Sequence, residues 1–293
     1  MHLRGAVSCT KSREAARFER EREHEVEVER EREREVEPER EKEGMTAYYD
    51  AEATRDEYLR FHFPESDELA ALLAPLPAPP LGERFPVGVR RFWDPAPGAL
   101  ALDLGCACGR MTLELARDHA VAVGMDRSAL LVAAARAVAS TGRARYPAVV
   151  EGHVRRAVDV PVEVPGRVAF HVGDAHAPPY ADGRFATVVA LNLVDRVGDP
   201  ARCLAAAGRL VRPGGLLIVS SPYTWKAEYA DPARWLGGVV RDDGRPVHGA
   251  EGVREALGPS YRLEREGRLP FYIPWHDRSG QLAVAHVQRF RKG

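Results

Sequence analysis

The sequence predicts an α/β fold in which one seven-stranded sheet carries helices on both faces and an N-terminal helical segment forms a lid. Three observations lead to this prediction. An apolar run that ends at Asp103 is followed by a glycine-containing turn and a helix-like segment. Apolar runs and helical segments then alternate as far as Ser220, which is typical of strands joined by helices. Two further strand-like runs near the C-terminus are expected to form an antiparallel edge hairpin that completes the sheet.

Composition and charge limit the classes of function. The chain has 293 residues, of which 45% are hydrophobic and 29% are charged, enough for one large domain or two small ones. Its net charge is −1, so no overall basic field predicts a nucleic-acid partner. No apolar run approaches the roughly 20 residues that a membrane span needs. The four cysteines lack the spacing of a zinc site, and we interpret them as reduced thiols in a cytoplasmic protein without a metal centre.

Residues 1–44 differ in composition from the rest of the chain. Every odd-numbered residue from Glu19 to Glu43 is glutamate, which gives 13 glutamates against 7 arginines and lysines. The glutamates would share one face of a strand or lie four apart on a helix, and no apolar stripe could be buried. The sequence therefore predicts a disordered extension over residues 1–44 and a folded domain over residues 45–293. A charged helix that recruits a partner is the alternative, and Met45 is a second candidate start.

The turn after the first predicted strand has the character of a nucleotide-binding loop. It reads GCACG over residues 105–109 and leads into a helix expected over 110–118. Glycine lets backbone N–H groups approach a bound nucleoside or carboxylate, and the N-terminus of the helix adds positive charge. A dinucleotide fingerprint needs a third small residue that is missing here. The shorter pattern resembles the first motif of Rossmann-like S-adenosylmethionine-dependent methyltransferases, although any tight strand-to-helix turn can carry two glycines.

Two aspartates follow the next two predicted strands. Asp126 closes a strand over 121–125, where its carboxylate is placed to accept hydrogen bonds from both ribose hydroxyls of a nucleoside. Asp174 follows a strand over 168–172, where it can accept a hydrogen bond from an adenine amino group. Each aspartate alone also fits an ordinary surface turn.

Polar residues also follow the later strands. Side chains just past the C-terminal ends of parallel strands face the ligand crevice of an open α/β sheet. Asn192 and Asp195 come after a strand expected over 186–191, and Tyr223 comes after one over 216–220. We therefore expect them on the substrate side of the crevice. A salt bridge with Arg196 or a helix cap is the alternative for Asp195.

The remaining elements follow from local signals. Ser128 is a candidate N-cap, and the segment 143–165, which is rich in charges and prolines, is predicted to be an irregular insertion. One further helix is expected to begin near Glu52, and others are expected to cover 67–73, 129–139, 200–211 and 251–257. The two strands of the C-terminal hairpin are expected over 261–265 and 282–290.

Aromatic residues are concentrated in Tyr48–Phe63, ahead of the predicted sheet, and this density suggests the lid. Leu59 and Phe61 are expected in the core. Tyr48, Tyr49 and His62 have polar tips that can face a ligand.

Four stretches together resemble a narrower family. YYDAEATRDEYLRFHF, LDLGCACGR, LNLVDRVGDP and SSPYTWKAEYADPARWLGG are similar to the 4-mercaptohistidine N-methyltransferases of ovothiol biosynthesis, over a region from Tyr48 to the C-terminus. The resemblance implies that S-adenosylmethionine methylates an imidazole ring nitrogen of 4-mercaptohistidine or a related histidine thiol. It also implies a functional partnership with a separate sulfoxide synthase that supplies this substrate.

The resemblance implies roles for individual residues as well. Asp103, Gly105, Ala107 and Gly109 would hold the methionine half of the cofactor, Asp126 the ribose and Asp174 the adenine, with Cys106, Arg127, Ala175 and Asn192 completing the cofactor site. The predicted substrate site consists of Tyr48, Tyr49, His62, Asn192, Asp195 and Tyr223. Asp195 is the predicted catalytic residue, because an acceptor on the second ring nitrogen would fix the tautomer and take up developing positive charge.

Other functions share parts of this pattern. A nicotinamide-dependent dehydrogenase also has a glycine turn and an acid after the second strand, but the missing third glycine argues against it. A methyltransferase that acts on another small molecule would have the same sequence features and would differ only in its acceptor. A non-enzymatic protein that binds partners through its glutamate-rich segment would not need Asp126 and Asp174.

Overall fold

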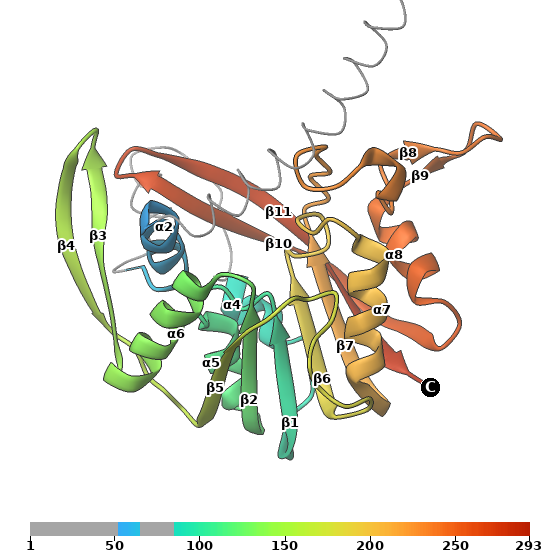
Figure 1. The fold of residues 1–293 in the computed structure, drawn as a ribbon, viewed down its shortest axis with the longest axis horizontal. Helices are drawn as coiled ribbons and strands as arrows, with labels where there is room; N and C mark the ends of the chain where they lie inside the picture. Colours follow the sequence, from blue (N-terminus) through green and yellow to red (C-terminus); the bar gives the residue numbers. More distant parts are fainter. Residues whose placement is uncertain (1–51, 65–84) are drawn as a thin grey trace, which may run out of the picture. The chain divides into compact units, whose positions relative to one another are not determined.

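A seven-stranded sheet runs through the fold in the order β10-β11-β7-β6-β1-β2-β5 (Figure 1). The strands from β7 to β5 are parallel, and β11 pairs antiparallel with both β7 and β10. The sheet strands are β1 (Ala96–Leu104), β2 (His119–Asp126), β5 (Arg167–Val172), β6 (Phe185–Leu191), β7 (Val211–Ser221), β10 (Tyr261–His276) and β11 (Ser279–Lys292). The predicted sheet and its edge hairpin are confirmed. Because β2 and β6 flank β1 on opposite sides, a ligand crevice is expected at the C-terminal ends of these strands.

The computed structural model describes residues 52–64 and 85–293, which belong to the unit Thr46–Gly293. The predicted extension over 1–44, the helix expected over 67–73, and Tyr48 and Tyr49 lie outside the described residues. Within the described ranges, no helix is both long enough and apolar enough to cross a membrane.

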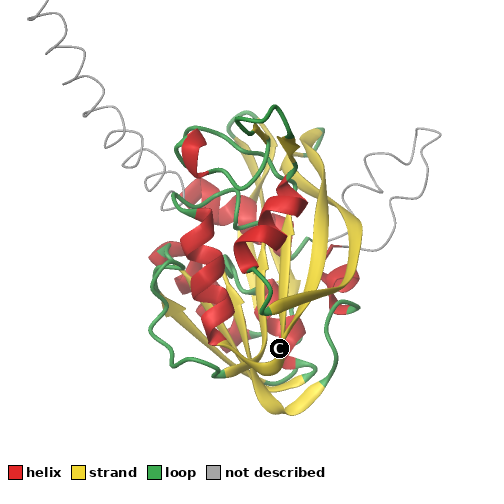
Figure 2. Cartoon of the chain, turned by 90° about the vertical axis from the view of Figure 1, so that its right-hand side faces the viewer, coloured by secondary structure: helices red, strands yellow, loops and turns green. Residues whose placement is uncertain are grey.

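Helices cover both faces of the sheet (Figure 2). They are α2 (Glu52–His62), α4 (Phe85–Arg90), α5 (Arg110–Ala116), α6 (Ala129–Thr141), α7 (Pro200–Leu210) and α8 (Gly249–Leu257), with a short 3₁₀ turn at Pro232–Arg234. Neighbouring residues of β1 pack on opposite faces, because successive side chains of a strand alternate. Ala101 packs with Leu115 of α5, whereas Leu102 packs with Leu204 of α7, and all of these side chains are fully buried.

The predicted irregular insertion is wrong, because most of this segment is a β-hairpin. Strands β3 (Arg143–Glu151) and β4 (Val154–Pro161) form a separate two-stranded antiparallel sheet. Ala144, Tyr146 and Ala148 alternate with exposed residues and are buried against α2 and α6. Pro147 lies on the exposed face of β3, where a two-stranded ribbon tolerates a missing N–H donor. A second small sheet pairs β8 (Val239–Val240) with β9 (Pro246–Val247).

The C-terminal hairpin is longer than predicted. β10 and β11 continue to a turn at residues 277–278, well beyond the strands expected over 261–265 and 282–290. The tip of the hairpin reaches the N-terminal helix, because Arg60 of α2 donates a hydrogen bond to Asp277 Oδ1 at 2.9 Å. Figure 1 shows α2 between this hairpin and β3–β4.

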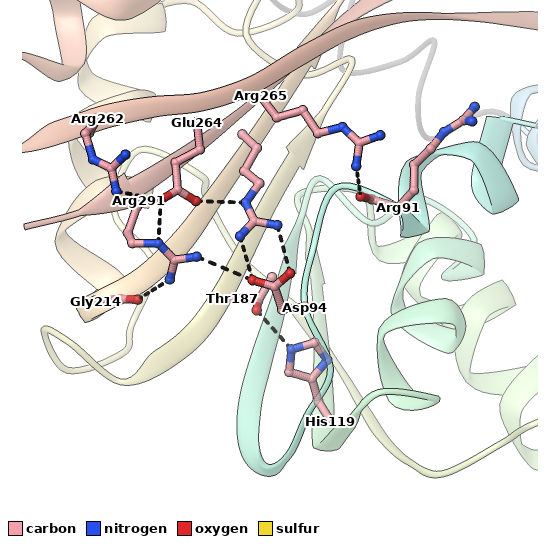
Figure 3. A network of polar contacts seen from close by, with 10 residues as sticks. Arg91, Asp94, His119, Thr187, Gly214, Arg262, Glu264, Arg265 and Arg291 are labelled. Carbon is pink, nitrogen blue, oxygen red and sulfur yellow. Dashed lines mark hydrogen bonds and ion pairs between the residues drawn. The ribbon is translucent and has the colours of Figure 1, made fainter.

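A network of arginines and carboxylates fixes the other end of the hairpin (Figure 3). Glu264 of β10 accepts hydrogen bonds from Arg289 at 3.1 Å and from Arg291 at 2.7 Å. The same two arginines donate to Asp94, which lies two residues before β1. The ion pairs therefore connect the edge hairpin to the start of the central strand, and Arg289 and Arg291 hold the pKa values of Asp94 and Glu264 below their usual range.

Candidate active site

A cavity of about 730 Å³ lies at the C-terminal ends of β1, β2, β5 and β6, with α2 and β10 forming part of its wall. This volume falls within the range of roughly 300–1,000 Å³ that is common for small-molecule sites. Ten of the predicted site residues line it: His62, Asp103, Gly105, Cys106, Ala107, Asp126, Arg127, Asp174, Ala175 and Asn192. The structure therefore brings together most of the predicted cofactor site.

Backbone geometry explains the glycine loop after β1. Gly105 has φ +80°, and a Cβ atom at this position would lie 2.8 Å from a methyl carbon of Leu193. Ala107 also has a positive φ of 45°. The loop therefore turns sharply and presents backbone rather than bulky side chains to the cavity.

Gly109 has a different role from the one predicted. It does not line the cavity, and a Cβ atom there would lie 2.7 Å from the ring of Phe170 in β5. Gly109 is the N-cap residue of helix α5 and has a φ of +84°. Gly109 therefore allows the helix to pack closely on the sheet, and its predicted contact with the cofactor stays a prediction.

Asp126 joins the glycine loop to the end of β2. Its Oδ2 accepts a hydrogen bond from the Ala107 amide, and its Oδ1 accepts one from the Ser128 amide, both at 2.9 Å. Burial raises the pKa of Asp126, while these amides oppose the rise by stabilising the charged form. Each carboxylate oxygen has about two acceptor sites, so the side chain can still accept hydrogen bonds from a ligand. Ser128 caps α6 by accepting from Leu131, as predicted.

Asp103 lies deeper, at the end of β1. Its Oδ2 accepts a hydrogen bond from Thr112 Oγ1 at 2.8 Å, and only 2% of the residue is exposed. Burial raises the pKa of Asp103 to about 7, and the neighbouring charge of Asp126 adds to the rise. The carboxyl group is therefore close to half ionised near neutral pH, and a cation bound beside it would favour the ionised form.

Asp174 and Asn192 lie at the ends of β5 and β6. Asp174 is exposed at the cavity rim, and its Oδ1 accepts hydrogen bonds from the amide and from Nδ1 of His176. Asn192 has φ +51°, and its Oδ1 accepts from Ser220 Oγ at 3.0 Å. Asp174 is thus held by the turn that follows β5, and Asn192 by the neighbouring strand β7.

Asp195 does not line the cavity, so the prediction that it contacts substrate directly is not supported by the geometry. Its side chain is fully buried, and Oδ2 accepts a hydrogen bond from the Thr224 amide at 3.0 Å. The turn after β6, closed by the hydrogen bond from the Arg196 amide to the Leu193 carbonyl, directs Asp195 inward. Burial raises the pKa of Asp195, and the nearby Arg196 opposes the rise.

Tyr223 also lies outside the main cavity, contrary to prediction. In the segment after β7, Pro222, Thr224 and Lys226 line the main cavity, whereas Tyr223 and Trp225 line a second cavity of about 650 Å³. Tyr223 has a positive φ of 54°, so the backbone turns at this residue and its side chain leaves the main cavity. The Tyr223 hydroxyl lies 3.2 Å from His286 Nδ1 of β11, away from the first cavity.

His62 lines the cavity from the last turn of α2. Its Nδ1 is buried and has no hydrogen-bond partner within residues 52–64 and 85–293. Burial lowers the pKa of His62 to about 3, and the positive charge of Arg110 contributes to the lowering. The imidazole is therefore uncharged near neutral pH, and its Nδ1 has almost no accessible surface in this conformation.

Sequence reasoning missed much of the remaining wall. Phe271, Ile273 and Trp275 of β10 line the cavity at every second position of that strand, and Arg196, Lys226 and Tyr229 line it beyond β6 and β7. The alternation of apolar residues along β10 after residue 269 was a sequence signal for Phe271, Ile273 and Trp275.

Burial raises the pKa values of Cys106, which lines the cavity, and of Cys108, which lies beside it in the glycine loop, so both thiols are protonated near neutral pH. Among the described residues, no group of histidine, cysteine and acidic side chains is arranged to hold a metal ion.

Comparisons with known proteins agree with this geometry. A family model described as a methyltransferase domain matches residues 102–219. The chain is 31% identical over 218 residues to 27-O-demethylrifamycin SV methyltransferase of Amycolatopsis mediterranei. This match covers 66% of this chain and 71% of that protein. It is 32% identical over 132 residues to an uncharacterized 37.1 kDa protein in transposon TN4556 of Streptomyces fradiae, a match that covers 44% of this chain and spans only 32% of that protein. A crystal structure of magnesium protoporphyrin IX methyltransferase from Synechocystis with bound S-adenosylmethionine aligns over 86% of this chain and 97% of that one, at 15% identity and a TM-score of 0.47.

The Gly105→Ala variant should lower the free energy of unfolding by about 1–3 kcal/mol, since alanine is strained at positive φ and its Cβ would meet Leu193. Chemical denaturation measures the change. Gly98→Ala in the preceding strand β1 is the control, because a Cβ atom there meets nothing within 4 Å. Equal stability of the two variants would contradict the described loop geometry.

Proposed function

The chain belongs to the class I S-adenosylmethionine-dependent methyltransferases, and on that basis we propose that it methylates an imidazole ring nitrogen of 4-mercaptohistidine or a related histidine thiol, as in ovothiol biosynthesis. His62 supports this acceptor most directly. An uncharged imidazole with a buried, unpartnered nitrogen among the described residues is suited to exchange a hydrogen bond with the ring of a histidine-like substrate.

The cofactor half of the cavity fits S-adenosylmethionine. The Gly105 turn leaves no room for a Cβ atom and presents backbone to the cavity, while Asp126 keeps acceptor sites beyond those used by Ala107 and Ser128. The glycine loop and Asp103 would hold the methionine half, Asp126 the ribose and Asp174 the adenine. When bound, S-adenosylmethionine supplies a methyl group that is activated by a positively charged sulfur.

The other half of the cavity is left for the acceptor. Its walls are the α2 face with Tyr58 and His62, the β10 side chains with Trp275, and the segments after β6 and β7. Aromatic and aliphatic groups such as Phe271 limit the access of water to the reacting groups. Holding two reactants in the productive orientation can supply roughly 7–11 kcal/mol of barrier lowering in favourable cases.

His62 takes the role first predicted for Asp195. The acceptor ring must present one nitrogen without a proton, and a hydrogen bond from its other N–H to His62 Nδ1 would fix that tautomer. Because the pKa of His62 is about 3, Nδ1 accepts a hydrogen bond and does not remove the proton outright. A thiolate on the same ring would offset the positive charge that the ring gains. We further propose that a separate sulfoxide synthase supplies the thiol in the cytoplasm.

The identity of the acceptor is tested by product analysis. The protein with S-adenosylmethionine and 4-mercaptohistidine should give a product heavier by one methyl group, which nuclear magnetic resonance should locate on a ring nitrogen. Histidine and a catechol serve as parallel acceptors. Methylation of the catechol oxygen alone, or of the thiol sulfur, would contradict the proposed acceptor while leaving the methyltransferase activity intact.

The His62→Gln variant should lower kcat about 10- to 100-fold with little change in S-adenosylmethionine affinity, since a hydrogen bond to the acceptor ring is lost. Steady-state kinetics and calorimetry separate the two quantities. His153→Gln is the matched control, because His153 is exposed in the β3–β4 turn. A kcat of His62→Gln equal to that of the control would remove the role of His62.

Asp103 should make cofactor binding depend on pH. The ammonium group of S-adenosylmethionine favours the ionised carboxylate, so protonation of Asp103 below about pH 7 competes with binding. Affinity should fall as the pH is lowered from about 7.5 to about 5.5, approaching tenfold per unit at the acid end. Calorimetry of Asp103→Asn should show weaker binding and a flat profile, with exposed Asp159→Asn as the control. An unchanged slope in Asp103→Asn would assign the pH dependence to another group.

A further inference from the structure

We propose that Arg196 and Lys226 bind a carboxylate of the acceptor, so that the cavity selects acceptors with an anionic end. This assignment rests on the proposed function, in which the acceptor is an amino acid. Both residues line the main cavity, where they follow β6 and β7 and lie on the opposite side of the crevice from β2 and β5.

The cavity wall carries charges of both signs, with Arg110 and Arg127 near the aspartates and Glu57 on α2. The aspartates that line the cavity, Asp103, Asp126 and Asp174, follow β1, β2 and β5 and belong to the cofactor half. Arg196 and Lys226 line the part beyond β6 and β7. A ligand that extends beyond β6 and β7 would therefore meet two cationic side chains there.

Arg196 is held in a fixed orientation before any ligand binds. Its guanidinium carbon lies 4.6 Å from the centre of the Tyr229 ring, and its Nε lies 3.9 Å from Asp195 Oδ2. Asp195 is itself fixed by the Thr224 amide. A guanidinium group that is stacked on a ring and anchored at one edge loses little conformational freedom when it binds a carboxylate.

Lys226 approaches the same aromatic ring. Its Nζ lies 5.9 Å from the centre of the Tyr229 ring and 3.0 Å from Glu228 Oε1. The turn that follows Lys226, in which the Tyr229 amide donates to the Lys226 carbonyl, brings the two residues together. Tyr229 thus places an arginine and a lysine at one site.

The acidic partners of these cations do not line the cavity. Asp195 is fully buried behind Arg196, and Glu228 lies outside the cavity wall. Two cationic side chains therefore line the cavity at this point, each with an acidic partner outside the cavity wall, and the buried carboxylate of Asp195 helps to keep Arg196 in position. An arginine that recognises a planar carboxylate through two N–H groups fits this arrangement.

The carboxylate of the cofactor is the competing ligand for these cations. The cofactor already meets the backbone of the glycine loop and Arg110, the first residue of α5, which lines the cavity beside that loop. Arg110 Nε is buried and has no hydrogen-bond partner among the described residues. Arg110 Nη2 pairs with Glu114 Oε1 at 2.6 Å, which orients the guanidinium beside the loop. We assign Arg110 to the methionine carboxylate by this position, and Arg196 and Lys226, which lie beyond β6 and β7, to the acceptor.

Substitution of Arg196 tests this assignment. With 4-mercaptohistidine and its carboxamide as acceptors, the wild type should favour the acid, and Arg196→Gln should raise KM for the acid about 10- to 100-fold with little change in kcat. Arg196→Lys should restore part of the affinity, because the charge remains. Exposed Arg145→Gln on β3 is the control. An unchanged KM, or a loss of S-adenosylmethionine affinity equal to the loss for the acid, would overturn the proposal.

Binding without turnover separates this proposal from the proposed reaction. Calorimetry with the S-adenosylhomocysteine complex compares imidazole-4-acetate with imidazole-4-acetamide, and phenylacetate with phenylacetamide. The wild type should bind at least one acid more tightly than its amide, and Arg196→Gln should remove that preference even if no mercaptohistidine is methylated. Equal or absent binding of acids and amides by the wild type would overturn the carboxylate site.

Discussion

The two hydrogen bonds accepted by Asp126 are the constraint on which the ligand crevice depends. The Asp126 carboxylate accepts one hydrogen bond from the Ala107 amide in the loop after β1 and one from the Ser128 amide at the start of α6. This loop, the end of β2 and the start of α6 therefore meet at one carboxylate. Close packing beneath this point is allowed by Gly124, where a Cβ atom would lie 2.6 Å from Thr112 Oγ1. Asp126 thus joins the loop after β1 to the start of α6 and still lines the cavity.

The central sheet could be predicted from the sequence because its signals are local. Each parallel strand is a short apolar run closed by a turn residue, and the rule that ligands bind beyond the C-terminal ends of such strands then placed Asp103, Asp126 and Asp174 correctly at one cavity. The β3–β4 hairpin could not be recognised in the same way. Its buried residues, such as Tyr146, are explained by contacts with α2 and the residue after it, because the Tyr146 hydroxyl donates to the Phe63 carbonyl at 3.1 Å.

The incorrect positions within the site have a common physical cause. After a strand ends, the side on which the next side chains lie depends on the backbone angles of the turn. Asn192 and Tyr223 both adopt a positive φ, of 51° and 54°, at the ends of β6 and β7. This conformation is uncommon for residues other than glycine and has no clear sequence signal at Tyr223. As a result, Asp195 points into the protein and Tyr223 faces the second cavity, while Arg196 and Thr224 take the places expected for their neighbours.

The acceptor half of the site is built by the segments that lie outside the central sheet pattern. Arg60, which is 4% exposed, donates hydrogen bonds to the Val149 carbonyl of β3 and to Asp277 at the tip of the β10–β11 hairpin, each at 2.9 Å. These contacts hold α2, and with it His62, over the cavity. The proposed cofactor half is therefore set by the sheet itself, whereas the proposed acceptor half also depends on an inserted hairpin, an extended edge hairpin and one helix between them. Because these elements can change without disturbing β1 or β2, acceptor choice can diverge within this fold while cofactor binding is retained.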